Sequence, residues 1–201
     1  MPRKRHSVAQ HELFDPALPE GFAYREDVFT RADEAEYVRA FETLPFKPFE
    51  FQGYLGNRRI VSFGWQYDYS NKTLRERGNV PAFLEPLRDL AAGIADVPAS
   101  SLRQALVTEY APGAGIGWHR DRPMFEDVVA FSFVSPCRLR FRRKDGDTWE
   151  RAAVEVAPRS AYLMRGPARW AWYHSIPAMQ ALRYSVTFRN FVPERAMREQ
   201  A

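Results

Sequence analysis

The sequence predicts one α+β domain that is mainly β, a sandwich or barrel with helices packed outside, and three observations favour this class. The chain has 201 residues, a length at which a single domain is expected and no disulfide or metal is needed merely to fold. From residue 103 onward, short strand-like segments follow one another at near-regular spacing, as in sandwiches and barrels. Aromatic residues make up 14% of the chain, which is typical of a β-rich core or a stacking surface.

The composition also argues against a membrane protein or a secreted protein and indicates a reducing compartment. No apolar run approaches the roughly 18 residues of a transmembrane helix, and the basic N-terminus lacks the apolar segment of a secretory signal. The single cysteine, Cys137, excludes an intrachain disulfide framework and fits a reducing compartment. We therefore expect a cytoplasmic protein without a membrane partner, and a monomer. The net charge of +4 permits a polyanionic partner without demanding one.

Two helices are predicted in the first half. Thr30 can cap the first, whose opening turn carries acidic residues that suit the helix dipole, and Pro45 ends it. The second covers 81–96, where leucines recur at spacings of three and four, and Pro86 must lie near its first turn.

Strands are predicted before and after the second helix. The first begins at 58 and runs to 69, and a turn at 144–147 joins two of the later strands as a hairpin. The later strands are 104–110, 128–134, 138–142, 151–156, 161–164, 171–175 and 183–188. We expect residues 21–192 to form the domain, residues 1–20 a flexible basic arm, and residues 193–201 a C-terminal tail.

Three side chains have the composition of a metal site. His119 and Asp121 form a His-x-Asp pair after a glycine-rich loop, and His174 follows in a predicted strand. Two imidazoles and one carboxylate are the ligand set of non-haem Fe(II) oxygenases, although Mn, Ni or Zn can occupy such a triad too. The alternative is structural: an ordinary hydrogen-bonded loop pair and a core histidine.

The last predicted strand alternates between two kinds of side chain. Arg183, Ser185 and Thr187 share one face, with Arg189 at its end, while apolar residues share the other. Burying this polar face inside a barrel costs free energy unless an anion fills the space beside it. A guanidinium can bind such an anion, for example a carboxylate, with two hydrogen bonds. The alternative is an outward face with two solvated arginines.

Together these residues resemble the AlkB family of Fe(II)/2-oxoglutarate-dependent dioxygenases, from about Pro19 to Phe191. The closing Arg-Tyr-x-x-Thr-Phe-Arg is specific to that family, whereas His-x-Asp, His and Arg are shared by a wider superfamily. The stretches that carry the resemblance are Tyr110–Gly113, Trp118–Asp121, Phe125–Val129, Arg165–Arg169, Tyr173–Pro177 and Arg183–Arg189.

The resemblance implies a double-stranded β-helix (jelly roll) with flanking N-terminal helices, and a role for each matching residue. His119, Asp121 and His174 would hold the iron as the catalytic centre. The cosubstrate 2-oxoglutarate would be bound by Arg183 at its distal carboxylate, with support from three further residues. These are Arg189, Tyr110 and Thr108, the last at a position where the family usually has asparagine.

The implied reaction uses O2 to convert 2-oxoglutarate to succinate and CO2 while a substrate methyl group is hydroxylated. If the methyl group is on nitrogen, the product releases formaldehyde. The expected substrate is an alkylated nucleic acid, single-stranded DNA or RNA, from which the enzyme would remove N-methyl groups as DNA repair or as RNA modification.

In the family, the segment before the jelly roll forms a nucleotide-recognition lid, which corresponds here to about 50–72. Its aromatic stripe would stack a base and its arginines would hold phosphates, with Trp118 beside the metal motif. The alternative is that the stripe is ordinary strand core. The candidate substrate residues are Trp65, Tyr67, Tyr69, Arg58, Arg59 and Trp118. Further arginines between 120 and 143 would add positive charge around the mouth.

Three alternatives to nucleic-acid demethylation remain open. The same chemistry can act on a protein side chain. A catalytically silent nucleic-acid-binding module would keep the fold but has no need for an intact triad and Arg183. A zinc hydrolase would not explain the arginine strand.

Overall fold

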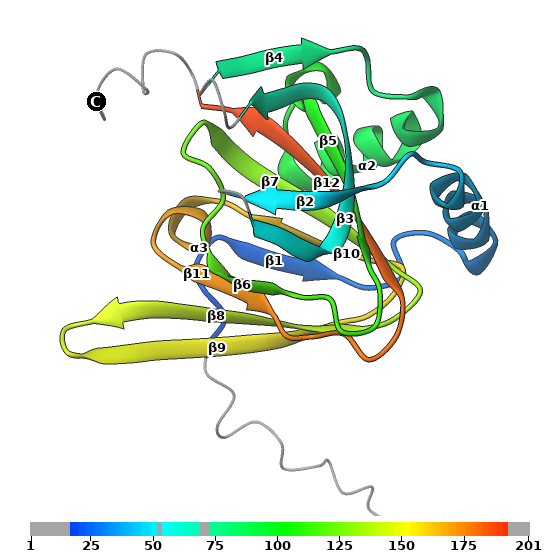
Figure 1. Ribbon diagram of the computed structural model, residues 1–201. Helices are drawn as coiled ribbons and strands as arrows, with labels where there is room; N and C mark the ends of the chain where they lie inside the picture. The colour runs from blue at the N-terminus through cyan, green and yellow to red at the C-terminus, as the bar shows by residue number, and fades with distance from the viewer. Residues whose placement is uncertain (1–16, 52–53, 69–72, 193–201) are drawn as a thin grey trace, which may run out of the picture.

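The computed structural model describes residues 17–51, 54–68 and 73–192. Two antiparallel sheets enclose a cavity, which is lined by residues of both, so the described chain forms the jelly roll with flanking helices that the sequence predicts (Figure 1).

The larger sheet contains eight strands in the order β1-β10-β7-β12-β5-β3-β2, with β4 paired to β3. Its long central strands pair through most of their length, so that Arg183 of β12 lies opposite Tyr110 of β5. The strands are β1 (Phe22–Arg25), β2 (Lys47–Phe51), β3 (Tyr54–Asp68), β4 (Thr73–Arg77), β5 (Gln104–Tyr110), β7 (Phe125–Phe133), β10 (Ser160–Met164) and β12 (Arg183–Phe191).

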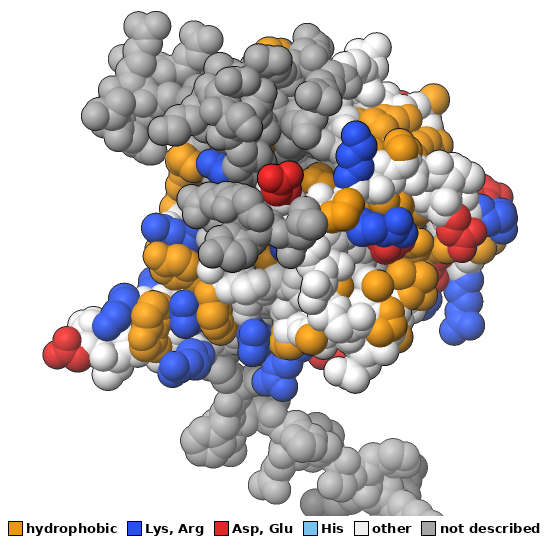
Figure 2. Space-filling view, viewed as in Figure 1, with side chains coloured by type: hydrophobic (Ala, Val, Ile, Leu, Met, Phe, Trp, Pro, Cys, Tyr) orange, Lys and Arg blue, Asp and Glu red, His pale blue; other side chains and the backbone are white. Residues whose placement is uncertain are grey.

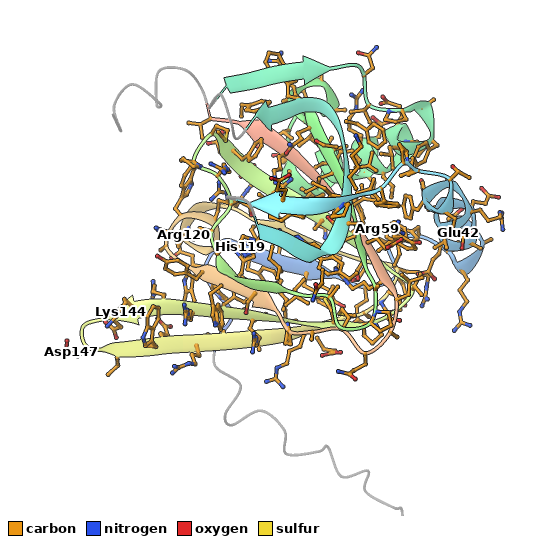
Figure 3. The ribbon with its side chains drawn as sticks, in the orientation of Figure 1. Glu42, Arg59, His119, Arg120, Lys144 and Asp147 are labelled. Carbon is orange, nitrogen blue, oxygen red and sulfur yellow. The ribbon has the colours of Figure 1, made fainter. Side chains whose placement is uncertain are left out.

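The smaller sheet contains four strands in the order β6-β11-β8-β9. The strands are β6 (Ile116–His119), β8 (Cys137–Asp145), β9 (Thr148–Val156) and β11 (Tyr173–Ile176). β8 and β9 form a long hairpin that projects from the barrel, and Lys144 and Asp147 lie at its tip (Figures 1 and 3). The turn predicted at 144–147 is confirmed, and Gly146 takes there a positive φ of 54° that favours glycine.

The two predicted helices form where the sequence places them, and two short helical segments are added. Helix α1 (Arg31–Glu42) begins after Thr30, whose hydroxyl accepts from the Asp33 amide while the Asp33 carboxylate accepts from the Thr30 amide, a complete capping box. A short 3₁₀ turn η1 (Ala82–Leu84) leads into α2 (Glu85–Ala95), with Pro86 in its first turn. The sequence did not predict η2 (Ala99–Ser101) or the five-residue α3 (Gly166–Trp170).

Two apolar clusters stabilise the fold, one on each side of the larger sheet. The outer cluster joins α1 and α2 to the sheet through residues such as Phe41, Leu87 and Phe133. The inner cluster lies inside the barrel and includes Leu139 and Phe141 of β8. The apolar face of β12 packs into the outer cluster, so its polar face turns inward, as predicted.

The predicted strand 104–110 is confirmed with its ends, the other predicted strands are confirmed with changed ends, and β1, β2, β4 and β6 were missed. The predicted segment 171–175 starts too early, because α3 ends in a turn at Ala171 before β11 begins. Residues 1–16 of the predicted arm and the tail 193–201 lie outside the described residues, so the division into arm, domain and tail stays a prediction. The cytoplasmic location also stays a prediction. None of the helices in the described ranges is long and apolar enough to cross a membrane.

Candidate active site

The glycine-rich loop after β5 brings the two histidines together. A side chain at Gly115 would collide with backbone atoms of Ile176 and Pro177, the nearest of them 2.8 Å from the position of its Cβ. Only glycine therefore permits the loop to approach the end of β11 this closely. The approach lets β6 pair with β11, and His119 then lies directly opposite His174.

Asp121 lies against the two imidazoles. The ring centroids of His119 and His174 are 4.2 Å apart, and His174 Nε2 is 3.6 Å from Asp121 Oδ2. Arg189 donates from Nη2 to Asp121 Oδ1 over 3.0 Å and from Nη1 to Gln104 over 3.1 Å. The structure thus brings together the three residues predicted as the triad, with Arg189 beside them.

A backbone contact fixes the tautomer of His119. Its Nδ1 lies 2.9 Å from the carbonyl oxygen of Gly117. Because a carbonyl oxygen only accepts, Nδ1 must carry the proton and donate it, which leaves the lone pair on Nε2. A histidine that ligates a metal commonly has its other nitrogen held in this way.

Burial and charge set the protonation of the cluster. Burial, assisted by the neighbouring His119, lowers the pKa of His174 to about 3, and burial also lowers the pKa of His119. Burial alone would raise the pKa of Asp121, but Arg189 and the two histidines hold it well below its usual value. At neutral pH the cluster therefore presents two neutral imidazoles and a carboxylate, the protonation state in which these groups bind metals.

The donor types fit a divalent metal ion, and the side chains need adjustment to hold one. Within residues 17–51, 54–68 and 73–192, no group of three His, Cys, Asp or Glu side chains already forms a metal site. Asp121 is engaged by Arg189, so it and the two rings must draw together around an ion.

Arg183 supplies a second feature of the site, a buried cation without a counterion. Its side chain is fully buried, and Nε donates to Ser132 Oγ over 3.0 Å. Among the described residues, Nη1 and Nη2 have no hydrogen-bond partner. The guanidinium carbon lies 5.1 Å from the Tyr110 ring centroid. Buried donors of a cation are costly to leave unpaired, so this arrangement fits an anion that reaches the base of the cavity.

The cavity has a volume of about 900 Å³ and is lined by most of the predicted site residues. Arg183 lies behind Tyr110 rather than in the lining. The predicted residues that do line the cavity are Thr108, Tyr110, His119, Asp121, His174 and Arg189 from the metal and cosubstrate sets, with Arg58 and Trp118 from the substrate set.

Of the other predicted substrate residues, Arg59 and Trp65 do not line this cavity. Arg58 and Arg59 are neighbours in a strand, so their side chains point to opposite faces, and Arg59 forms a two-bond ion pair with Glu109, 2.7 Å for each bond. In Figure 3 it lies on the side of α1, away from His119. Trp65 packs against Arg103 and Phe191. Tyr67 is described only by its backbone in β3, and Tyr69 lies outside the described residues.

One lining residue, Arg169, had no assigned role in the sequence analysis, whereas Arg120 was expected to add positive charge at the mouth. Arg169, on α3, is 2% exposed, and Nη2 donates to the carbonyl oxygens of Phe125 and Arg122. At the mouth, Arg120 donates from Nη1 to the Trp170 carbonyl over 2.9 Å, and its guanidinium lies over the Tyr173 ring. A cation within the quoted motif 165–169 was the available signal for Arg169, but nothing local predicted that α3 would turn it inward.

Comparisons with known proteins agree with this architecture. A family model described as "2OG-Fe(II) oxygenase superfamily" matches residues 24–189. A solved structure of OsALKBH1 superposes with a TM-score of 0.64 at 15% sequence identity, covering 87% of this chain and 98% of that one, a likeness that concerns the fold.

Two relatives have names that mention nucleic acids. The "Alkylated DNA repair protein ALKBH8 homolog" of Arabidopsis thaliana is 31% identical over 147 residues, which are 61% of this chain and 42% of that protein. The mouse "tRNA (carboxymethyluridine(34)-5-O)-methyltransferase ALKBH8" is 26% identical over 176 residues, 80% of this chain and 24% of that protein. The matches thus span less than half the length of either relative.

Proposed function

This chain belongs to the 2OG-Fe(II) oxygenase superfamily as an AlkB-like dioxygenase, and from that premise we propose that it oxidises alkyl groups on nucleic-acid bases. One atom of O2 enters succinate as 2-oxoglutarate loses CO2, and the other becomes the hydroxyl group of the product. With an N-methyl base, the hydroxymethyl group leaves as formaldehyde and the nitrogen regains its proton.

The triad residues would hold the iron. His119 and His174 offer neutral nitrogens, His119 with its tautomer fixed by Gly117, and Asp121 offers a carboxylate. Fe(II) bound there supplies the coupling of 2-oxoglutarate decarboxylation by O2 to oxidation of a C–H bond. Arg189 restrains Asp121 through its 3.0 Å ion pair and so positions that carboxylate.

The base of the cavity supports 2-oxoglutarate binding. The two unpaired nitrogens of Arg183 match the distal carboxylate of a dicarboxylate in number and charge. Tyr110 and Thr108, which lie opposite Arg183 and Ser185 in the pairing of β5 with β12, bring hydroxyl groups to the cavity lining. The fully buried guanidinium of Arg183, whose terminal nitrogens have no partner among the described residues, is the observation that carries the proposal.

The mouth of the cavity supports a nucleic-acid substrate. Trp118, Tyr173 and Trp170 present aromatic rings there, and Arg58 and Arg120 add positive charge. An unstacked base is bound by such rings and its phosphates by such cations. The names of the two relatives favour the same substrate class, DNA in one case and tRNA in the other.

The test is succinate formation with Fe(II), ascorbate and 2-oxoglutarate in the presence of a single-stranded oligonucleotide bearing 1-methyladenine or 3-methylcytosine. We expect succinate and formaldehyde to rise together with the methylated strand, and no rise with its unmethylated twin. Succinate that no oligonucleotide changes would contradict a single-stranded oligonucleotide as the substrate, keep the dioxygenase chemistry and direct the search to tRNA or protein. The absence of succinate with iron bound would favour a silent binding module.

A further inference from the structure

The β8–β9 hairpin carries a row of cations held on aromatic rings. Along β8, side chains alternate between the barrel interior and the outside, and Arg140, Arg142 and Lys144 all point outward. Neighbouring strands add aromatic rings to the same surface. We call this set the cation–aromatic strip, and it comprises Arg120, Arg140, Arg142, Lys144, Trp118, Trp149 and Tyr173.

Arg142 lies at the centre of the strip. Its guanidinium carbon is 4.4 Å from the Trp118 ring centroid, 4.5 Å from that of Trp149 and 5.7 Å from that of Tyr173. On either side, Arg140 lies 5.0 Å from Trp118, and Lys144 Nζ lies 5.4 Å from Trp149. The rings therefore fix the positions of the cations.

A ring can hold a cation in position without cancelling its charge. None of the four cations of the strip forms an ion pair with a carboxylate in the described parts of the chain. Arg143, on the opposite face of the same strand, is paired with Glu150 at 2.6 Å. A row of cations without counterions is suited to a partner with regularly spaced negative charge.

The strip is continuous with the active site. Trp118, Arg120 and Tyr173 also line the cavity, while Lys144 lies at the far end of the hairpin. Figure 2 shows blue and orange side chains alternating over this region, and Figure 3 labels Arg120 beside His119 and Lys144 at the hairpin tip. From Arg140 to Lys144 the strand spans about 14 Å, roughly the length of two to four nucleotides.

We propose that the cation–aromatic strip binds the phosphodiester backbone of an unpaired polynucleotide beside the nucleotide that enters the cavity. The inference rests on the proposed function and extends it from the target base to the flanking strand. An unpaired strand fits better than a duplex, because its bases reach the rings and the cavity without the cost of unstacking. Each cation contacts a phosphate and releases a counterion.

The test compares two double variants with the same loss of charge. Arg140→Gln with Lys144→Gln removes two cations of the strip. Arg31→Gln with Arg39→Gln removes two exposed cations of α1, at the opposite end of the molecule (Figure 1). The affinity of each protein for an unmodified single-stranded DNA of about ten nucleotides is measured as a function of salt concentration.

We expect the slope of log affinity against log salt to be less negative by about 1.4 in the strip variant, since each phosphate contact contributes about −0.7 for a single strand. At about 0.1 M salt this amounts to roughly a 25-fold loss of affinity. The α1 variant should keep the wild-type slope. Thermal unfolding checks both folds, and Lys144→Gln alone, at an exposed residue near the turn, gives half the slope change if the double variant is unstable.

A turnover measurement separates this inference from the proposed function. The strip variant should lose kcat/KM for a methylated oligonucleotide of the same length and keep it for a methylated mononucleotide. Unchanged slope and kcat/KM, with the oligonucleotide still oxidised, overturn the strip as a binding surface and leave the proposed function intact. Weaker binding of polyglutamate with unchanged kcat/KM for the oligonucleotide assigns the strip to an acidic protein and also overturns the inference. A wild-type enzyme that neither binds nor oxidises any oligonucleotide overturns both.

Discussion

The two faces of β12 show how one strand serves both stability and chemistry. On one face, Tyr184, Val186 and Phe188 are buried in the apolar cluster beneath α1 and α2. On the other, Ser185, Thr187 and Arg189 line the cavity, with Arg183 fully buried beside Tyr110. Every residue from Arg183 to Asn190 is buried, so the faces differ in what the buried groups contact rather than in exposure.

The difference teaches that burial here has two opposite meanings. Burial of an apolar side chain on the helix side stabilises the folded state by about 25 cal/mol per Å² of apolar surface removed from water. A guanidinium on the cavity side loses its hydration, and the free-energy cost of that loss is offset only when an anion binds to it. Substitutions on the helix side should therefore change folding, whereas substitutions on the cavity side should change ligand binding and turnover.

The largest effect is expected at the triad. His174→Ala should abolish succinate formation, because it removes one of the proposed protein ligands, while thermal unfolding of the metal-free protein stays close to that of the wild type. Turnover and Fe(II) binding are measured on the same preparation. Retained iron-dependent turnover would show that His174 is not one of the ligands that the reaction requires.

The next largest effect is expected on the helix side. Phe188→Ala should destabilise the protein by about 3–5 kcal/mol, because it leaves a cavity among rings that include Phe131, 6.2 Å away between centroids. The KM for 2-oxoglutarate of the remaining folded enzyme should not change. Denaturant unfolding and steady-state kinetics give the two quantities. A selective rise in that KM would show that the faces are not independent.

Arg183→Met sharpens the comparison from the cavity side. Losing charge-assisted hydrogen bonds worth roughly 3 kcal/mol should raise the KM for 2-oxoglutarate roughly 100-fold. Stability without 2-oxoglutarate should be kept or increased, since the variant removes a buried cation whose terminal nitrogens have no partner among the described residues. Arg59→Met is the matched control, because it breaks the ion pair with Glu109 outside the cavity and should leave this KM unchanged. Equal KM changes in both variants would place the anchor elsewhere.

The sequence predicted the parts of the fold that rest on regular alternation. Residues 104–110 and the two faces of β12 follow from their strand-like pattern, and the helix after Thr30 follows from its cap and the acidic residues of its first turn. The four-residue β6 contains a glycine and depends on the close approach at Gly115, which no local pattern reveals. Likewise, Arg183 was expected to line the pocket, but its place behind Tyr110 depends on the pairing of β12 with β5.

The smallest effect tests the aromatic stripe of β3, where the sequence left both alternatives open. Arg58, Ile60 and Ser62 line the cavity, whereas Trp65 packs between Arg103, 4.6 Å from its ring, and Phe191. The ring of Trp65 is half-buried on these partners. Trp65→Ala should therefore reduce stability by about 1–3 kcal/mol and leave oligonucleotide affinity unchanged.

Trp118→Ala is the counterpart, because Trp118 is also half-buried but lines the cavity. It should weaken oligonucleotide binding by about 1–3 kcal/mol, the size of one lost stacking contact. Thermal unfolding and oligonucleotide titration of both variants give the comparison. If Trp65→Ala loses affinity as Trp118→Ala does, the stripe belongs to the substrate surface. If the two variants differ as expected, β3 resembles β12 in combining residues that pack with residues that line the cavity, Trp65 among the former and Arg58, Ile60 and Ser62 among the latter.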